Sequence, residues 1–308
     1  MAFADGKRTT PGPKPAWLKV PLPHGETTAE LSRILRERGL HTVCEEAKCP
    51  NQGECWAGGT ATFMLLGDVC TRGCRFCNVK TNKNGLPIDE HEPRKVAEAV
   101  AATKLRYVVL TMVDRDDLDD GGAGHVAATI AAIKRQDPEI LVEALVGDFQ
   151  GNTEQIATVL ASKPDVFAHN LETVQRLTKR VRDHRCDIER SLDVLQTAKR
   201  LLPGIVTKSS LMLGLGESER EIEDTLDALR SHDVDVLTLG QYLRPTVLHL
   251  PVAEHVTPAR FEALAQRAKT KGFLYVASGP LVRSSYKAGE YYLENYLKQR
   301  RTSAAQSR

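Results

Sequence analysis

Short apolar runs alternate with amphipathic stretches along most of this chain. Apolar runs of roughly four to eight residues between helical stretches are typical of a parallel sheet buried on both faces. The predicted strands are Thr62–Leu66, Tyr107–Met112, Ile140–Val146, Val166–His169, Ile205–Leu213, Val234–Leu239 and Phe273–Ala277. The predicted helices are Thr28–Arg38, Pro93–Thr103, Gly124–Arg135, Thr153–Ala161, Ser191–Leu201, Glu219–Ser231 and Pro258–Lys271.

This alternation predicts an α/β fold. Six or more strand–helix units in one chain favour a TIM-like barrel, or an open part of one, over two separate domains. We expect three regions: residues 1–58 with an extended, proline-rich arm, residues 59–275 as a partial (β/α)6 barrel, and residues 276–308 as a C-terminal segment with a basic tail. The two extensions are expected to cover the barrel mouth together. Within the first region, Cys44–Gly59 is predicted to be a turn-rich loop.

Composition narrows the class of protein. The chain has 308 residues, 41% of them hydrophobic and 27% charged, and this balance is typical of a soluble globular protein. A net charge of +2 does not indicate a nucleic-acid partner, and no apolar run approaches the roughly 18 residues that span a membrane. The amino-terminal residues lack the apolar core of a secretion signal, so we expect a reducing compartment, the cytoplasm.

Six of the seven cysteines stand within residues 44–77, in two triplets. The first is Cys44-x4-Cys49-x5-Cys55, and the second is Cys70-x3-Cys74-x2-Cys77. Three thiolates can hold three corners of a cubane iron–sulfur cluster and leave one iron open to another ligand. Two such triplets in tandem predict two clusters with two different tasks.

Three other uses of cysteine are less compatible with this pattern. Disulfides are disfavoured by the expected reducing compartment and by the odd number of cysteines. Structural zinc is disfavoured because its ligands usually come as two close pairs, and no histidine lies between Cys44 and Cys77. A ferredoxin-type run of four cysteines is absent from the sequence.

The second triplet begins a few residues after the first predicted barrel strand, so it belongs to the strand-to-helix loop at the catalytic rim. The next such loop, Val113–Asp120, is rich in carboxylates. Its Asp114 and Arg115 are candidates to bind the ammonium and the carboxylate of an amino acid. Asn170 and Glu172 follow the fourth strand, and Gly214 and Gly216 follow the fifth, so these residues also belong to the predicted rim.

The loop Cys70–Cys77, with the sequence CTRGCRFC, resembles the cluster motif of the radical S-adenosylmethionine (SAM) superfamily. The upstream segment CEEAKCPNQGECW resembles the auxiliary-cluster motif of the lipoyl synthase family. Further segments resemble the same family at residues 59–77, 109–125, 166–177, 207–217, 237–252 and 276–286. Two segments depart from the family pattern, at residues 141–151 and 181–191, and the second contains Cys186, to which we assign no role.

The resemblance implies insertion of two sulfur atoms at C6 and C8 of an octanoyl chain bound to a lysine of a carrier protein. It implies two 4Fe-4S clusters and SAM as cofactors. In that case Asp114 and Arg115 could bind the methionyl group of SAM, Asn170 and Glu172 its ribose hydroxyls, and Gly214 and Gly216 could admit its adenine edge. Cys70, Cys74 and Cys77 would hold the cluster that cleaves SAM. The auxiliary cluster, consumed as the sulfur donor, would be held by Cys44, Cys49, Cys55 and a serine of the RSSY motif at 283–286, for which we choose Ser285 over Ser284. No catalytic residue is predicted beyond the cluster ligands.

The resemblance also implies partners: an octanoylated lipoyl-carrier domain or protein, an electron donor such as a flavodoxin or ferredoxin, and an iron–sulfur carrier that renews the spent cluster. Two other functions remain open at this stage. One is a radical SAM methylthiotransferase, which also has an amino-terminal cysteine triplet. The other is an iron–sulfur scaffold or electron carrier without catalysis, in which the acidic second loop and the segment Gly214–Glu217 would have no purpose.

Overall fold

The structure, a computed structural model, describes residues 14–19, 26–46, 49, 51–103, 105–285, 295–297 and 299. The strands of the main sheet are β1 (His41–Thr42), β2 (Thr60–Leu65), β5 (Tyr107–Met112), β6 (Leu141–Leu145), β7 (Val166–Ala168), β8 (Val206–Leu213), β9 (Val236–Gln241) and β10 (Tyr275–Gly279). The pair β3 (Val69–Cys70) and β4 (Lys80–Thr81) forms a separate small sheet.

The helices of the described residues fall into two groups. The amino-terminal group comprises the short 3-10 helix η1 (Ala16–Leu18), α1 (Glu26–Arg38), α2 (Val43–Glu46) and α3 (Gln52–Ala57). The barrel group comprises α4 (Glu92–Thr103), α5 (Ala123–Gln136), η2 (Phe149–Gly151), α6 (Thr153–Ala161), α7 (Gln175–Val181), α8 (Ile188–Leu201), α9 (Glu219–Ser231) and α10 (Pro258–Thr270). None of them is both long enough and apolar enough to cross a membrane.

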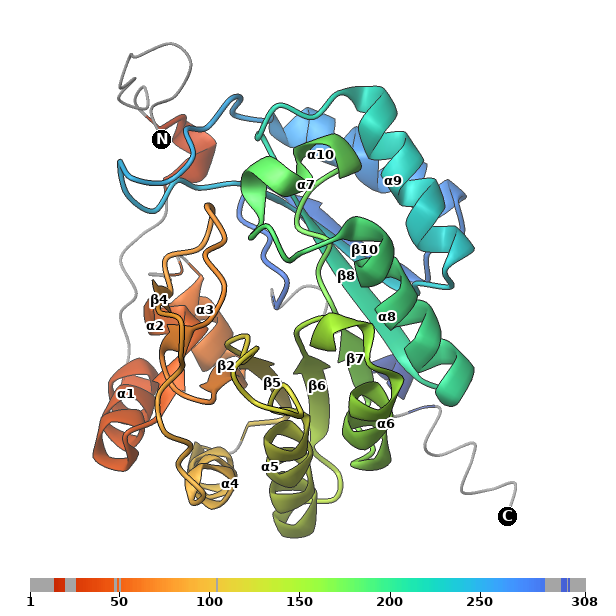
Figure 1. Cartoon of the computed structure of the whole chain (residues 1–308). Helices are drawn as coiled ribbons and strands as arrows, with labels where there is room; N and C mark the ends of the chain where they lie inside the picture. Colours follow the sequence, from red (N-terminus) through yellow and green to blue (C-terminus); the bar gives the residue numbers. More distant parts are fainter. Residues whose placement is uncertain are drawn as a thin grey trace.

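Among the described residues, the main sheet has eight strands in the order β1-β2-β5-β6-β7-β8-β9-β10. Only β1 is antiparallel to its neighbour, and every other pair is parallel. The strand order follows the chain order, so each helix between two strands returns over the outside of the sheet (Figure 1). The predicted partial barrel is therefore confirmed, and each predicted strand and helix is present.

Apolar side chains on both faces explain why the sheet forms. The strand residues of β2 and β9 are all buried, and the facing stripes of the outer helices supply the second layer of the core. Helix ends are fixed by local chemistry: Ser218 and Glu221 form a capping box that starts α9, and the Thr257 hydroxyl accepts from Arg260 N–H at the start of α10.

Polar residues inside the barrel form hydrogen bonds with one another. Lys208 Nζ donates to Glu143 Oε2 over 2.8 Å, and Tyr107 Oη donates to the same oxygen over 2.8 Å. All three side chains are buried, so their mutual bonds replace the water that each loses on folding. This group lies toward the amino-terminal ends of the strands, away from the cysteine loops.

The predicted loop Cys44–Gly59 is instead largely helical, as α2 and α3. The reason is packing: Cys55 and Trp56 are buried on α3, and α3 contacts β2 and α1. A helix satisfies its own backbone hydrogen bonds while Cys55 and Trp56 are buried, so it suits this position better than an open loop. Helix α7 was not predicted either, because its seven residues give too short a stretch for a helical period to be recognised.

Candidate metal centres

The second cysteine triplet lies on the loop that follows β2, at the carboxyl ends of the barrel strands. Two backbone N–H groups donate to its sulfur atoms: Arg72 N–H to Cys70 Sγ over 3.4 Å, and Asp183 N–H to Cys74 Sγ over 3.3 Å. The N–H of Cys77 donates to the Cys74 carbonyl, which closes the turn between these two cysteines. Amide donors directed at sulfur stabilise thiolate ligands of a cluster.

Burial, together with the nearby Asp114 carboxylate, raises the pKa of the Cys70 thiol to about 12. Burial also raises the pKa of Cys77, and Glu172 and Asp114 add to the effect. Such thiols hold their protons at neutral pH until a positive charge displaces them. A metal centre supplies that charge, so the loading of this site must release protons.

Arg72 lies at the centre of a buried ion-pair network beside the second triplet. Its guanidinium contacts Asp148 over 2.7 Å, Asp116 over 2.8 Å and Asp114 over 3.6 Å. Burial raises the pKa of Asp114 to about 6, although Arg72 opposes that rise. The Cys70 thiol in turn donates to Asp114 Oδ2 over 3.9 Å. The sequence reasoning missed Arg72, Asp116 and Asp148, and only the place of Arg72 between two predicted ligands could have drawn attention to it.

A pocket of about 360 Å³ opens next to this network. Its lining includes Asp114 and Arg115, two of the predicted SAM contacts. Arg115 is engaged locally, because its guanidinium forms two hydrogen bonds with Asp117. It also packs so tightly on Gly85 that a Cβ there would lie 2.2 Å from Arg115 Nε. The structure therefore gives Arg115 a role in fixing two loops, and its predicted contact with SAM remains a prediction.

Asn170 and Glu172 lie together after β7. Asn170 Nδ2 donates to Glu172 Oε1 over 3.0 Å, while Asn170 Oδ1 is buried without a hydrogen-bond partner. Burial raises the pKa of Glu172, and its carboxylate is close enough to Cys77 to act on that thiol electrostatically. A buried acceptor without a partner beside a cluster-ligand candidate is the pattern expected of a ligand-binding edge.

Gly214 and Gly216 have a different environment from the one predicted. The N–H groups of Gly214 and Leu215 both donate to the Glu217 carboxylate, so the backbone donor of Gly214 is already used. Gly214 has φ +93°, and a Cβ on it would lie 2.3 Å from the Glu254 carbonyl oxygen. Packing against the segment before α10 thus explains this glycine, and the predicted approach of adenine remains a prediction.

The first triplet is held between α2, α3 and β2. Cys44 and Cys55 are buried, and the N–H of Cys49 donates to the Cys44 carbonyl over 2.9 Å. Burial, with a smaller effect of Cys49, raises the pKa of Cys44 to about 11. Thr62 and Trp56 lie against the same thiol and oppose this rise.

The C-terminal segment reaches the first triplet through two contacts. Thr62 Oγ1 donates to Ser285 Oγ over 3.0 Å, and Asn51 Nδ2 donates to the Leu281 carbonyl over 2.6 Å. Because Thr62 also contacts Cys44, the Ser285 hydroxyl lies one hydrogen-bonded residue away from that thiol. Arg283 is close to Cys49: burial lowers the pKa of its guanidinium and Cys49 opposes that change. Tyr286, the last residue of the motif, lies outside the described residues.

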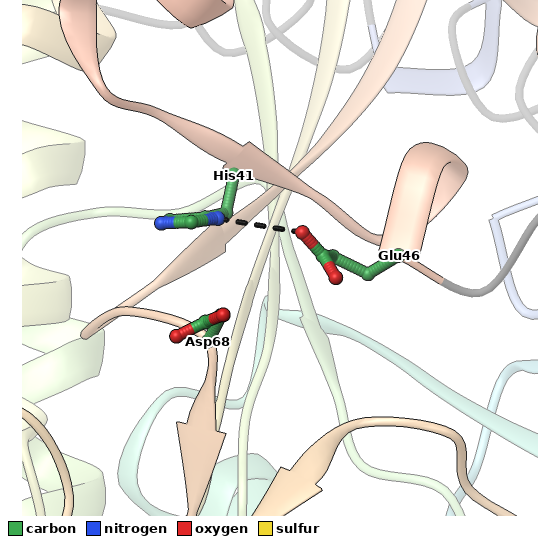
Figure 2. A group of neighbouring side chains, drawn as sticks. All are labelled: His41, Glu46 and Asp68. Carbon is green, nitrogen blue, oxygen red and sulfur yellow. Dashed lines mark hydrogen bonds and ion pairs between the residues drawn. The ribbon is translucent and has the colours of Figure 1, made fainter.

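The two triplets are neighbours. Asn78, which follows Cys77, donates from Nδ2 to the Glu46 carbonyl over 3.2 Å. Figure 2 shows a second bridge, in which His41 and Glu46 of the amino-terminal elements face Asp68 of the loop that leads to Cys70; His41 Nδ1 and Glu46 Oε1 are 3.5 Å apart. Lys80 forms an ion pair with Asp68 of this group. The bridge joins the loop of one triplet to the helix of the other.

Comparisons with known proteins agree with this arrangement. A family model of the radical SAM superfamily matches residues 64–229, and one of the N-terminal domain of lipoyl synthase matches residues 6–49. The chain is 55% identical to the mitochondrial lipoyl synthase of Yarrowia lipolytica over 99% of this chain and 87% of the relative. It is 56% identical to that of Emericella nidulans, over 94% of this chain and 71% of the relative.

The chain belongs to the lipoyl synthase family. It is therefore a radical SAM enzyme, a sulfurtransferase whose cofactors are SAM and two 4Fe-4S clusters.

Solved structures agree on the fold alone. Methylornithine synthase superposes with a TM-score of 0.56 at 12% identity, over 82% of this chain and 75% of that one. An FeFe-hydrogenase maturase from Carboxydothermus hydrogenoformans superposes with a TM-score of 0.55 at 12% identity, over 87% and 78%. Both similarities support the partial barrel.

The expected cytoplasmic location is wrong. The relatives from Yarrowia lipolytica, Emericella nidulans and Schizosaccharomyces japonicus are all named as mitochondrial lipoyl synthases. The interpretation of the cysteines does not depend on this difference, because all seven are free thiols in the structure.

The residues of the two triplets fit the clusters that the lipoyl synthase family uses. The thiols are free, their burial favours a bound metal over free thiolate, and N–H donors face Cys70, Cys74 and Cys44. For the first triplet, an oxygen donor, Ser285 Oγ, lies at the edge of the sulfur set. Three sulfurs and a displaceable oxygen form a donor set suited to iron.

Proposed function

We propose that this chain inserts two sulfur atoms into a protein-bound octanoyl group, with one cysteine triplet serving each half of the reaction. Cys70, Cys74 and Cys77 hold the cluster that acts on SAM. Cys44, Cys49, Cys55 and Ser285 hold the cluster that gives up sulfur. The observation that carries this proposal is the contact of Thr62 with both Cys44 and Ser285, which joins the C-terminal motif to the first triplet.

The chemistry explains why cofactors are needed. Alkane C–H bonds at C6 and C8 are far less acidic than any side chain can address, so no general base of the protein can open them. When bound, SAM and the two clusters supply hydrogen abstraction by a radical and the sulfur itself. The protein has to position these groups and to keep water and stray C–H bonds away.

The chain's own residues perform that positioning. The N–H groups of Arg72 and Asp183 orient two sulfurs of the second triplet, and the buried Arg72–Asp148 ion pair fixes the loop that carries them. Asn170 and Glu172 offer a buried acceptor and a carboxylate on the Cys77 side of the site, where the ribose or methionyl group of SAM fits. Asp114, Arg115, Gly214 and Gly216 remain candidate SAM contacts.

The proposed ligands of the first cluster combine the soft thiolates of the first triplet with one hard oxygen donor, Ser285. Thiolates bind iron firmly, while a serine oxygen is a harder ligand that is displaced more readily. Such an uneven set suits a cluster that must be dismantled in each turnover. Thr62 holds the Ser285 hydroxyl in place, so this residue pair controls how easily the oxygen leaves.

Regions and partners complete the proposal. The predicted regions 1–58, 59–275 and 276–308 are kept as part of the proposal, except that the last strand of the barrel, β10, continues to Gly279. The substrate is an octanoylated lipoyl-carrier domain or protein, reduction comes from a flavodoxin- or ferredoxin-like donor, and an iron–sulfur carrier renews the auxiliary cluster. We propose a mitochondrial location, as for the relatives.

The two alternative functions are not supported. A methylthiotransferase or a non-catalytic iron–sulfur scaffold would not account for 55% identity to a lipoyl synthase over 99% of the chain. The decisive assay is anaerobic: protein reconstituted with iron and sulfide receives SAM, a reductant and an octanoyl-lysine peptide. Formation of both 5′-deoxyadenosine and dithiolated peptide supports the proposal, and absence of deoxyadenosine contradicts it.

Two variants test the division of labour. Cys74→Ala should abolish 5′-deoxyadenosine formation, because it removes a ligand of the SAM-cleaving cluster. Cys49→Ala should keep deoxyadenosine formation and stop sulfur insertion. Circular dichroism of both variants establishes whether they are folded. Equal loss of both products in two folded variants would contradict separate roles for the triplets.

A further inference from the structure

Cys186 is the one cysteine outside the two triplets, and the structure places it beside Cys74. It lies between α7 and α8 and is 6% exposed. The distance of 112 positions from Cys74 in the sequence hides this proximity. Neither the family motifs nor the proposed sulfur insertion uses Cys186.

Three hydrogen bonds hold the chain segments of the two cysteines together. Gly73 N–H donates to Asp183 Oδ2 over 2.8 Å, Asp183 N–H donates to Cys74 Sγ over 3.3 Å, and Arg75 N–H donates to the Val181 carbonyl over 2.9 Å. Cys186 N–H closes the turn by donating to the Asp183 carbonyl. The relative position of the two cysteines is thus fixed by backbone on both sides.

The two thiols are near neighbours that act on each other's pKa, and Asp183 joins them: its N–H donates to Cys74 Sγ, and its carbonyl accepts from Cys186 N–H. A guanidinium N–H of Arg72 also reaches Cys186 Sγ, over 3.7 Å. A disulfide forms once the two sulfurs reach the bond length of about 2.05 Å. Rotation about the Cα–Cβ bonds is the movement that brings neighbouring thiols together.

We propose that Cys74 and Cys186 form a reversible disulfide when the SAM-cleaving cluster has been lost. Two thiols give up two protons and two electrons as the sulfur–sulfur bond forms. A peroxide takes them up, so that one hydrogen peroxide becomes two water molecules. A dithiol reductant reverses the step and returns both thiols.

This disulfide has a chemical consequence for the empty site. A free ligand cysteine exposed to peroxide proceeds to sulfinic and sulfonic acids, which ordinary thiol reductants do not reverse. Pairing with Cys186 stops Cys74 at a reducible stage, so the protein can be loaded again after reduction. The inference rests on the proposed function only in assigning Cys74 to a cluster.

The positions of lysine and arginine make the disulfide easy to map. Trypsin cleaves after these residues, so digestion releases Cys74 in the tripeptide 73–75 and Cys186 in the pentapeptide 186–190. No other cysteine shares either peptide, and Cys77 leaves separately in 76–80.

For the experiment, the full-length protein is stripped of iron with a chelator under reductant, freed of both, and treated with one equivalent of hydrogen peroxide. Remaining thiols are alkylated before digestion and mass spectrometry. The linked pair 73–75/186–190 should exceed every other cysteine pair several-fold and disappear after reduction. Recovery of both peptides alkylated, while other cysteines are oxidised, would overturn the proposal, as would Cys74 linked mainly to Cys70 or Cys77.

Cys186→Ser provides the second measurement, because it keeps the size and polarity of the side chain. Before oxidation, the variant should bind as much iron as wild type after reconstitution. In this second measurement the metal-free protein receives at least two equivalents of peroxide, the amount that takes one unpaired thiol to sulfinic acid. After reduction and renewed reconstitution, wild type should recover about eight iron atoms per chain and the variant about four. Equal recovery would overturn the proposal. A separate measurement tests the assignment of Cys74 to a cluster, on which this inference rests. If that assignment is wrong, Cys74→Ala will bind as much iron as wild type after reconstitution.

Discussion

The hydroxyl of Thr62, in the first barrel strand, donates a hydrogen bond to the hydroxyl of Ser285 over 3.0 Å, although the two residues are 223 positions apart. Thr62 also contacts the Cys44 thiol. One threonine therefore joins the strand, the first cysteine triplet and the C-terminal motif. The contact gives a physical reason for preferring Ser285 over Ser284 as the oxygen ligand.

Thr62→Val should remove this contact at nearly constant volume. We expect sulfur insertion to fall by about tenfold, since a lost hydrogen bond of roughly 1.4 kcal/mol corresponds to that factor. Formation of 5′-deoxyadenosine should stay within about twofold of wild type. Thr62→Ser, which keeps the hydroxyl, is the matched control and should retain most of the insertion. An equal loss of both products in Thr62→Val would argue against a specific role at the first triplet.

His169 predicts how stability depends on pH. Burial, together with the nearby Arg182, lowers the pKa of its imidazole to about 4. An unfolded chain, with a histidine pKa near 6.5, binds the proton more readily, so acid favours unfolding. The contribution of His169 is present above about pH 6.5 and is lost as the pH falls toward 4. Between pH 7 and pH 5 it should cost about 2 kcal/mol of unfolding free energy.

Urea unfolding of the metal-free protein under reductant measures this effect. His169→Gln removes the titrating group and keeps a hydrogen-bonding side chain. The difference in unfolding free energy between pH 7 and pH 5 should be smaller in the variant by about 2 kcal/mol. If wild type and variant show the same dependence on pH, His169 is not the buried neutral group that the structure describes.

Gly214 and Gly216 form a matched pair for a test of packing. Both have positive φ, +93° and +105°, so alanine is strained at either position. Only at Gly214 would a Cβ also collide, 2.3 Å from the Glu254 carbonyl oxygen, whereas at Gly216 the nearest atom is 3.8 Å away. Gly214→Ala should therefore cost about 1–3 kcal/mol more in urea unfolding than Gly216→Ala. Equal costs would show that the backbone gives way at Glu254.

Local patterns predicted most of the barrel. Strand β5 coincides with an apolar run, because a strand covered on both faces is mostly apolar. Strand β8 departs from this rule, since Thr207, Lys208, Ser209 and Ser210 stand in it and are buried. The cysteine triplets were likewise visible, since ligands of one cluster lie close together in the chain. Ser285 was different: no local pattern distinguishes it from Ser284, and the family resemblance alone suggested it.

Contacts between distant segments were not predictable. Asp148 lies 76 positions from Arg72, and Cys186 lies 112 positions from Cys74, so neither pair leaves a periodic or spaced signal. Arg115 makes a short-range contact instead. Its place in an acidic loop predicts a ligand-binding fork, which stays a prediction, and its Nε and Nη2 groups donate to the neighbouring Asp117. Short-range ion pairs of this kind compete with binding and cannot be weighed without coordinates.

Arg72 offers the sharpest test of the buried network. Asp148 is fully buried, so burial alone would raise its pKa, but the Arg72 guanidinium overcomes this effect and lowers the pKa to about 2. Arg72→Met leaves the carboxylates of Asp148 and Asp116 without their main partner. We expect a loss of about 3–5 kcal/mol in unfolding free energy at pH 7 for the metal-free protein.

The dependence on pH should also change sign. In wild type the low pKa of Asp148 contributes stability above about pH 4 that is lost as the pH falls toward 2. Without Arg72, the same buried carboxyl prefers its neutral form, so lowering the pH from 7 toward 5 should bind protons to the folded state and stabilise the variant relative to wild type. Arg176→Met, which removes an exposed ion pair with Glu221, should change neither the stability nor its pH dependence measurably. If Arg72→Met is destabilised without this reversal, the loss comes from packing of the side chain rather than from the stranded carboxylates.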